Sequence, residues 1–378
     1  MKKGVYLDNN ATTPLRCEVI AALQKGLTAF GNPSSVYAVG QEARFALDEA
    51  RRQVADMCNV RSEQVVFTSG GTESNNMALR GAAGQGAIVT VLTEHPSVLK
   101  TALHLKEQGQ NVVCLHVDNN GLFSLDVLEE LLRDDHVKLV STMWVNNETG
   151  VVNPLADIAA LCKRYEVLLH VDAVQAAGKM KIDFPEMGAD MLSLSAHKLG
   201  GPKGVGALIL RNEVTMDPLL TGGSQEKNRR AGTENLMGII GMGAAAKVCQ
   251  TSLETETAKY QACKEALEQG LVALPFDIKI VGQYAPRVDS TTCFITSGLD
   301  AEAAVMALDM EGFAVSRGSA CSSGRSEPSH VLTAMGYSES ESKTALRVSF
   351  GWQTEVEDVK DFVQAFTRVA ERMLKKSA

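Results

Sequence analysis

The sequence lacks the features that mark several classes of protein. Its 378 residues contain no Cys-x-x-Cys pair, no internal repeat and no low-complexity tract. No uncharged stretch reaches the roughly 18 residues that cross a bilayer, and no early apolar run follows "MKKGVYLDNN", so we expect no signal peptide. Acidic residues outnumber basic residues by 45 to 37, a formal net charge of −8. These absences argue against a membrane protein, a nucleic-acid-binding surface and a paired-cysteine zinc or redox site.

The eight cysteines are scattered along the chain. Their spacing does not suggest a disulfide framework, and several lie in apolar runs such as "VVCLHV", so we expect a reducing cytoplasm. Cys321 differs, because its neighbours in "SRGSACSSG" are Ser, Gly and Ala, which are typical of a loop. From these residues alone, Cys321 is either a mobile reactive thiol or a cysteine that happens to lie in a turn.

Up to about residue 210, short apolar runs alternate with segments of helical period, such as "SLDVLEELLRDD". An amphipathic helix is also predicted over "GQEARFALDEARRQVADMC". The strand-like runs are "QVVFTS", "AIVTVL", "NVVCLHV", "VKLVSTMWV", "VLLHVD", "DMLSLSA" and "GVGALIL". This alternation predicts an α/β fold with a mostly parallel seven-stranded sheet that is covered on both faces.

The pattern changes after "LLTGGSQEKNRRAGTEN". We expect a long helix from about Leu236 to Ala273, followed by the strand-like runs "DSTTCFITS" and "ALRVSFG" among further helices. This arrangement predicts a smaller C-terminal α+β domain. We assign residues 15–255 to the large domain, and residues 1–14 with 256–378 to the small domain.

Polar residues gather where the predicted strands end, which is where ligands bind in parallel sheets. "VLLHVDAVQ" places Asp172 at a strand end, either as a buried anion with Gln175 nearby or as a helix N-cap. "SLSAHKLGGPKGVG" brings Ser195, His197 and Lys198 together before a glycine loop. Such a lysine is either a solvated surface charge or a partly buried amine that can act as nucleophile or base.

Weaker signals lie at other strand ends. In "TSGGTESNN", Gly70 and Gly71 open a helix whose free N–H groups would attract a phosphate, although Ser69 or Thr72 could also be an ordinary cap. The remaining candidates are His95 in "TEHPSVLK", Asn146 and Asn147 in "WVNNETG", and Arg347 in "ALRVSFG". A buried Arg347 would need a carboxylate partner.

Taken together, a helix-start phosphate site, a strand-end aspartate and a strand-end lysine describe a pyridoxal phosphate pocket. In such a pocket the lysine supplies the Schiff base, the aspartate pairs with the pyridinium nitrogen, and the cofactor acts as an electron sink.

The same motifs resemble those of the cysteine desulfurases of the NifS/IscS type, which are class V aminotransferases of fold-type I. The resemblance covers nearly the whole chain, through "YLDNNATTP", "FGNPSS", "SGGTESNN", "VNNETG", "HVDAVQ", "SAHKLGGPKGVG", "RRAGTEN", "GSACSSG" and "EPSHVL". It implies an enzyme that converts L-cysteine to L-alanine and leaves a persulfide on the nucleophile Cys321.

The resemblance also implies roles for the other site residues. Lys198 would bond the cofactor and move the substrate Cα proton, Asp172 would pair with the ring nitrogen, and His95 would stack on the ring. The remaining cofactor contacts would be Gln175 at the ring hydroxyl, Gly71, Thr72, Ser195 and His197 at the phosphate, Thr233 at the phosphate from the other subunit, and Asn147. Asn147 and Arg347 would bind the substrate carboxylate.

A homodimer is implied as well, together with a sulfur acceptor such as an iron–sulfur scaffold or a tRNA thiolation factor. The chain departs from many relatives at Arg317, which adds a positive charge before Cys321, and at Pro96, which follows His95. Two alternatives stay open: another class V enzyme, such as a selenocysteine lyase or an aminotransferase, and a catalytically silent homologue that acts as a scaffold.

Overall fold

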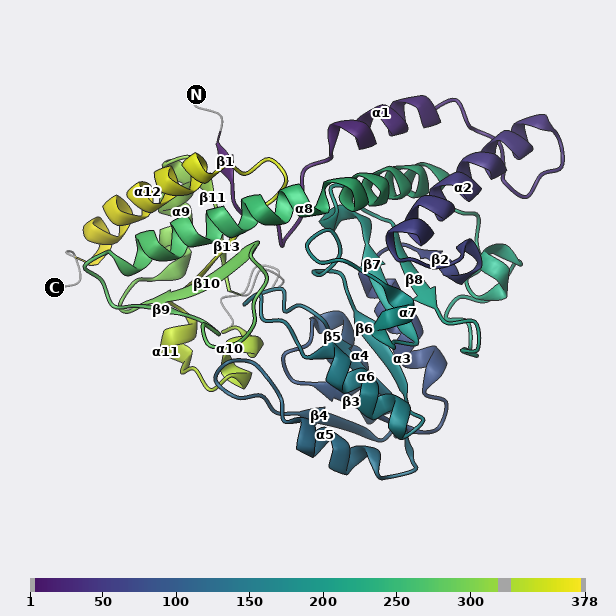
Figure 1. Ribbon diagram of the computed structural model, residues 1–378, viewed down its shortest axis with the longest axis horizontal. Coiled ribbons are helices and arrows are strands. Elements are labelled where there is room, and N and C mark those ends of the chain that lie inside the picture. Colours follow the sequence, from purple (N-terminus) through teal and green to yellow (C-terminus); the bar gives the residue numbers. More distant parts are fainter. Residues whose placement is uncertain (1–3, 319–327, 375–378) are drawn as a thin grey trace.

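The computed structural model describes residues 4–318 and 328–374 of the chain. Two sheets form the centres of two packed regions, and one long helix, α8 (Leu236–Val272), runs along both of them (Figure 1). A third, two-stranded sheet joins the N-terminus to the smaller region.

The larger sheet has seven strands in the order β2-β8-β7-β6-β5-β3-β4. Only β8 runs antiparallel to its neighbours, which confirms the predicted mostly parallel sheet. The strands are β2 (Val65–Thr68), β3 (Ala87–Val91), β4 (Val112–Leu115), β5 (Val137–Met143), β6 (Leu168–Asp172), β7 (Met191–Ser195) and β8 (Gly206–Leu210). Each lies within one of the seven apolar runs.

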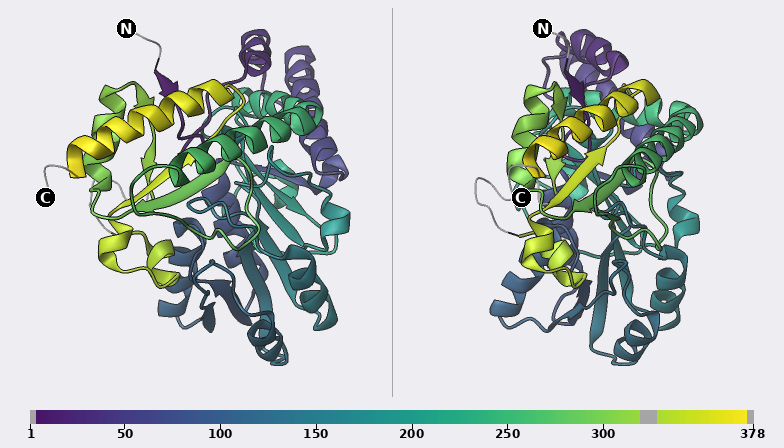
Figure 2. Two further views of the ribbon diagram at one scale, coloured as in Figure 1. Left: turned by 60° about the vertical axis from the view of Figure 1, so that its left-hand side comes forward. Right: turned by 90° about the vertical axis from the view of Figure 1, so that its left-hand side faces the viewer.

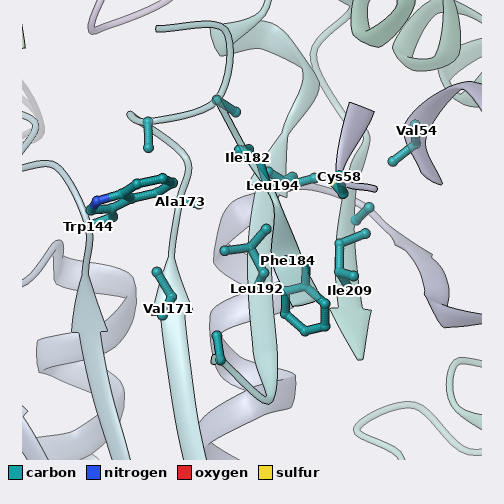
Figure 3. Packing of buried hydrophobic residues seen from close by; sticks show 14 of the residues in the cluster. Val54, Cys58, Trp144, Val171, Ala173, Ile182, Phe184, Leu192, Leu194 and Ile209 are labelled. Carbon is teal, nitrogen blue, oxygen red and sulfur yellow. The ribbon is translucent and has the colours of Figure 1, made fainter. Parts of the chain in front are cut away.

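Helices cover both faces of this sheet because side chains alternate along each strand. On one face, residues such as Phe67, Leu192 and Ile209 pack with α2 (Ala38–Met57), α5 (Leu125–Leu132), α6 (Leu155–Arg164) and the first half of α8. On the other face, α3 (Gly71–Ala82) and α4 (Pro96–Glu107) pack on the intervening strand residues. Figure 3 shows the first face, where Val54 and Cys58 approach Leu194 and Ile209.

The remaining short elements connect these parts. They are α1 (Cys17–Gly26), α7 (Phe184–Met187), η1 (Ser62–Gln64), η2 (Ala196–Lys198) and η3 (Gln225–Asn228). Helix α8 is long and apolar enough to meet a length-and-hydropathy test for crossing a membrane. However, it packs against α1, α2 and α12, so it is a core helix of the fold.

The smaller sheet is antiparallel, in the order β12-β13-β10-β9. It lies under the second half of α8, α9 (Ala301–Met310) and α12 (Val356–Leu374), while α10 (His330–Ala334) and α11 (Glu339–Ser342) lie at its other side (Figure 2). Its strands are β9 (Ile278–Ile280), β10 (Thr291–Thr296), β12 (Ser316–Arg317) and β13 (Ala345–Ser349). In β13, Leu346 and Val348 face the helices, so Arg347 between them faces the larger sheet.

The N-terminus begins in the smaller region, where β1 (Val5–Tyr6) pairs in parallel with β11 (Phe313–Ala314). Residues 8–14, which we call the N-terminal strap, then cross to the larger region. Asp8 bridges to Ser349, and the Thr13 N–H donates to the His197 carbonyl over 2.9 Å. The strap therefore lies between the two sheets.

The assignment of residues to two domains stays a prediction. Leu7 packs in the hydrophobic cluster of the smaller region, and α8 passes through residue 255 without interruption. The proposed boundary thus falls inside a helix that both regions share.

Candidate active site

A cavity of about 250 Å³ lies between the carboxyl ends of the parallel strands, the N-terminal strap and β13. It collects most of the residues singled out from the sequence. These are Gly71, Thr72, His95, Asn147, Asp172, Gln175, Ser195, His197, Lys198 and Arg347. Asn146 does not line it, because its side chain accepts the N–H groups of Glu148 and Thr149 in a turn.

Asp172 is the last residue of β6 and is buried. Its Oδ2 accepts a hydrogen bond from Nδ2 of Asn75 over 2.7 Å, and its Oδ1 accepts the Val174 N–H over 3.0 Å. A turn rather than a helix follows β6, so the helix N-cap interpretation of Asp172 is wrong. The carboxylate is a buried anion in the cavity wall.

Lys198 ends η2, immediately after β7. Its Nζ donates to the carbonyls of Asn10 and, over 2.7 Å, Ala11, both in the N-terminal strap. Lys198 is therefore a partly buried amine in the cavity and not a solvated surface charge.

The N-terminus of α3 opens onto the same cavity. Its N-cap is Gly70, and no side chain caps the first turn, so neither Ser69 nor Thr72 takes that role. A Cβ at Gly71 would stand 2.8 Å from Cγ2 of Val174, so a larger residue there would force the Val174 side chain to move. These N–H groups, with Ser195 and His197 beside them, can bind an anion such as a phosphate.

His95 is the N-cap of α4. Its Nδ1 accepts the Ser97 N–H over 3.1 Å and lies 2.7 Å from the Ser97 hydroxyl. Burial lowers the pKa of His95; the negative charge of Asp172 acts in the opposite direction, and the positive charge of Lys198 lowers it further. The ring is therefore a neutral imidazole with its proton on Nε2.

His197 also faces the cavity as a neutral ring, since burial followed by the charges of Lys198 and Lys203 lowers its pKa to about 4. Its Nδ1 lies 3.2 Å from Oγ1 of Thr12, a further contact with the N-terminal strap. The ring therefore supplies a hydrogen-bonding group without adding charge.

Arg347 is almost completely buried, and its Nη2 pairs with Asp8 over 2.6 Å. The carboxylate partner predicted for a buried Arg347 is therefore present. Nη1 donates to the Asn147 carbonyl over 3.0 Å. Among the described residues, Nε of Arg347 and Oδ1 of Asn147 are buried without a hydrogen-bond partner, so both can still receive a ligand.

Two further described residues named from the sequence, Thr233 and Arg317, do not line the cavity. Thr233 belongs to the segment before α8 and is exposed. Cys321 lies outside the described residues. Arg317, in β12, pairs with Glu302 of α9 over 2.9 Å, so part of its charge is balanced before the segment that carries Cys321.

Other residues at the site were missed in the sequence. Asn10, Asn75 and Ser97 line the cavity, and Lys179 contacts two of the side chains around it. "YLDNNATTP" and "SGGTESNN" contain two of them, but a sequence pattern does not tell which asparagine of a pair faces a cavity.

Comparison with known proteins gives the class of the molecule. The family model described as "Aminotransferase class-V" matches residues 5–362. The chain therefore belongs to the class V aminotransferase family, whose members are pyridoxal phosphate enzymes of fold-type I.

Within this family the chain is similar to the cysteine desulfurases of the IscS and NifS type. It is 40% identical to the cysteine desulfurase IscS of Dictyoglomus turgidum over 99% of this chain and 96% of that protein. The NifS-like protein of Rickettsia africae has a TM-score of 0.90 and 33% identity over 97% of this chain and 99% of its own. A structure described as SspA in complex with cysteine has a TM-score of 0.80 and 32% identity, covering 92% and 98%.

Proposed function

We propose that this protein is a pyridoxal phosphate-dependent cysteine desulfurase that converts L-cysteine to L-alanine and a persulfide on Cys321. The observation that carries the proposal is the convergence of Lys198, Asp172, Arg347 and the open N-terminus of α3 on one cavity. An amine, a buried carboxylate, a carboxylate-binding cation and a phosphate site are the groups that a pyridoxal phosphate enzyme acting on an amino acid needs.

The residues present fit this cofactor. The uncapped first turn of α3 suits its phosphate, and the buried Asp172 suits a protonated ring nitrogen. The positive charges of Lys198 and Arg347 face a cavity that can admit an anion. His95 is neutral, so its ring can lie against a cationic heterocycle without repelling it.

The side chains then have distinct tasks. When bound, pyridoxal phosphate supplies an electron sink for the pair left at the substrate Cα. Arg347 orients the substrate carboxylate through its unpartnered Nε, and Asn147 can donate to it from the N–H groups of its side-chain Nδ2. Lys198 would hold the cofactor and would move the proton at the substrate Cα; the strap carbonyls of Asn10 and Ala11 hold its amine in place. His95 can donate a hydrogen bond from its Nε2–H to a group bound in the cavity, because its Nδ1 already accepts the Ser97 N–H.

Cys321 is the proposed sulfur acceptor on the protein. Its thiolate bonds to the sulfur of the substrate while the Cβ–Sγ bond of the substrate breaks. The electron pair of that bond stays with Cβ, which takes up a proton, so that alanine leaves and the persulfide stays. The other seven cysteines do not compete for this role, because none of them lines the cavity. Burial also raises the pKa values of Cys58 and Cys293 to about 12 and that of Cys249 to about 11.

The working protein is proposed to be a cytoplasmic homodimer that passes sulfur to an acceptor such as an iron–sulfur cluster scaffold or a tRNA thiolation factor. Exposed apolar side chains near α1 and α2 support an interface there: Leu27, Phe30 and Val36 in the connection between α1 and α2, and Phe45 in α2. In the proposed dimer, Thr233 of each chain completes the phosphate site of the other. The seven cysteines in the described part of the chain are all unpaired, which is compatible with a reducing compartment.

The test is an assay with L-cysteine in which alanine and sulfide are measured together. We expect a yellow protein that forms alanine, and a Lys198→Ala variant that loses both the colour and alanine formation. A colourless wild-type protein saturated with pyridoxal phosphate would support a silent scaffold instead. Alanine formation from selenocysteine with none from cysteine would support a selenocysteine lyase, and amino transfer to a keto acid would support an aminotransferase.

A further inference from the structure

Lys179 is a partly buried lysine beside the cavity that has no task in the proposed reaction. It follows Gly178 in the turn after β6. Its Nζ donates to Oε1 of Gln175 over 2.7 Å and to Oδ1 of Asn10 over 2.8 Å. Both of these partners are neutral amide oxygens.

The surroundings of Lys179 make these two contacts important. Burial, followed by the positive charges of Lys198 and Arg347, lowers its pKa to about 7. A buried ammonium group is unfavourable unless its donors are satisfied. The two amides that serve it must therefore keep their oxygen atoms turned toward Nζ.

This constraint fixes the orientation of the Gln175 amide. A glutamine side chain can exchange its oxygen and nitrogen by a half-turn at little cost, so a neighbour has to decide which group faces which way. Here Oε1 is held by Lys179, and Nε2 donates to the Asn10 carbonyl over 3.0 Å. The second N–H of Gln175 is then left for the cavity that the residue lines.

Asn10 is held in the same way and connects several parts of the site. Its Oδ1 faces Lys179, so its Nδ2 is directed to the Asn147 carbonyl over 3.0 Å and to Oγ1 of Thr291 over 2.9 Å. Its own carbonyl accepts from both Gln175 and Lys198. The Lys179 ammonium group thus orients two amides. One is that of Gln175, which lines the cavity, and the other is that of Asn10, which contacts Asn147 of the proposed substrate site.

We propose that Lys179 is a positioning residue that turns the Gln175 amide so that an N–H donor, not a carbonyl oxygen, faces the ring oxygen of the bound cofactor. The inference rests on the proposed function for the identity of that cofactor. Loss of the Lys179 charge frees the amide to rotate and removes a donor that an anionic ring oxygen requires.

The test is the affinity of the apoprotein for pyridoxal phosphate, measured together with the position of the visible band of the bound cofactor. We expect Lys179→Met to weaken binding roughly tenfold, the effect of one hydrogen bond to a charged group, and to shift the band. Lys179→Arg keeps the charge and should bind within about twofold of wild type. Lys181→Met, which removes an exposed lysine from the same segment, is the matched control and should change neither quantity.

The same substitution made in a Gln175→Ala protein separates positioning of Gln175 from a general structural effect of losing Lys179. If Lys179 acts through Gln175, then Lys179→Met adds no further loss in a Gln175→Ala protein. Wild-type affinity in Lys179→Met, or an equal loss in both backgrounds, would overturn the proposal. If Lys179→Met does not fold, Gln175→Glu keeps an oxygen toward Lys179 but lacks the N–H; unchanged affinity there would also overturn it. A wild-type protein that binds no pyridoxal phosphate would contradict the proposed function instead.

Discussion

At the scale of single residues, a chain of hydrogen bonds links the buried anion of the site to its neutral imidazole. Nδ2 of Asn75 donates to both Asp172 and the Ser97 hydroxyl. Because Ser97 Oγ accepts there, its own proton is directed to Nδ1 of His95, 2.7 Å away. Ser97 and Asn75 therefore keep the His95 proton on Nε2.

Replacing Ser97 tests this link. We expect Ser97→Ala to lower kcat for alanine formation roughly fivefold, the effect of one neutral hydrogen bond, with little change in the KM for L-cysteine. Ser97→Thr keeps the hydroxyl and should retain most of the activity. Steady-state kinetics of the two variants measure this effect. Equal losses of kcat in both would contradict a role for the Ser97 hydroxyl in orienting His95.

Glu148 is a second informative residue, because it is a buried carboxyl group next to the proposed substrate site. Burial raises its pKa from 4.5 to about 7, although the Ser329 hydroxyl, which donates to Oε2, and the charge of Arg347 act in the opposite direction. The folded protein therefore binds this proton more tightly than the unfolded chain does. Its contribution to stability is present at low pH and is lost as the pH rises from about 4.5 to about 7.

Glu148→Gln should remove this pH dependence, since the amide stays neutral and can still accept from Ser329. We expect the variant to exceed wild type in free energy of unfolding by up to about 3 kcal/mol at pH 8, the equivalent of the pKa shift, and by less than about 1 kcal/mol near pH 5. Urea unfolding at the two pH values measures the difference. A difference that is the same at both would contradict the assignment.

The strand-end residues could be predicted from the sequence, whereas their supporting residues could not. Asp172 and Lys198 follow apolar strands of a parallel sheet, and the carboxyl ends of those strands meet at one edge, so position alone indicated a shared site. Asn10 and Lys179 come together across 169 residues through the path of the N-terminal strap. No local pattern encodes such a contact.

At the scale of elements, an ion pair anchors the segment before α8. Arg51 of α2 forms two hydrogen bonds with Glu226 of η3, each 2.7 Å long, and Oε2 of Glu226 also accepts the Phe67 N–H of β2. Three consecutive residues of this segment, Glu226 to Asn228, have φ values of 45°, 58° and 63°. Residues other than glycine rarely adopt such positive φ values. The buried pair keeps the segment in this strained conformation.

Breaking this pair from one side should be costly. We expect Glu226→Gln to lower the free energy of unfolding by about 3 kcal/mol, because it leaves Arg51 as an uncompensated buried cation. A double variant, Arg51→Met with Glu226→Gln, should lose less than the sum of the two single losses. Urea unfolding of the three variants measures the coupling, and strict additivity would contradict a direct pair.

The elements themselves could be read well from the sequence because their periodicities are strong. The seven apolar runs and the long helix α8 are present as expected. One feature of the elements was beyond this reading. The antiparallel direction of β8 depends on how the chain returns to the sheet, which no local pattern encodes.

At the scale of the whole molecule, the proposed homodimer makes a prediction of its own. Lys198→Ala and Thr233→Ala should each be inactive or strongly impaired alone. If Thr233 serves the partner's site, a mixed dimer has one site with both defects and one site with neither. Random mixing of the two proteins should then restore about a quarter of wild-type activity.

The same mixture distinguishes this arrangement from one in which Thr233 serves the site of its own chain. If Thr233 served its own chain, every site of a mixed dimer would carry one defect, and mixing would restore nothing. The matched control is each variant mixed with itself, which should show no gain. The measurement is alanine formation after the subunits have been allowed to exchange.

The central claim is that sulfur moves from L-cysteine to Cys321, and the mass of that residue after reaction tests it most directly. The protein is incubated with L-cysteine, and the peptide that contains Cys321 is analysed by mass spectrometry beside the same peptide from Cys321→Ala. We predict one added sulfur atom on Cys321 in the wild type and loss of sulfur release in the variant. An unmodified Cys321, or undiminished sulfur release by Cys321→Ala, would contradict the account.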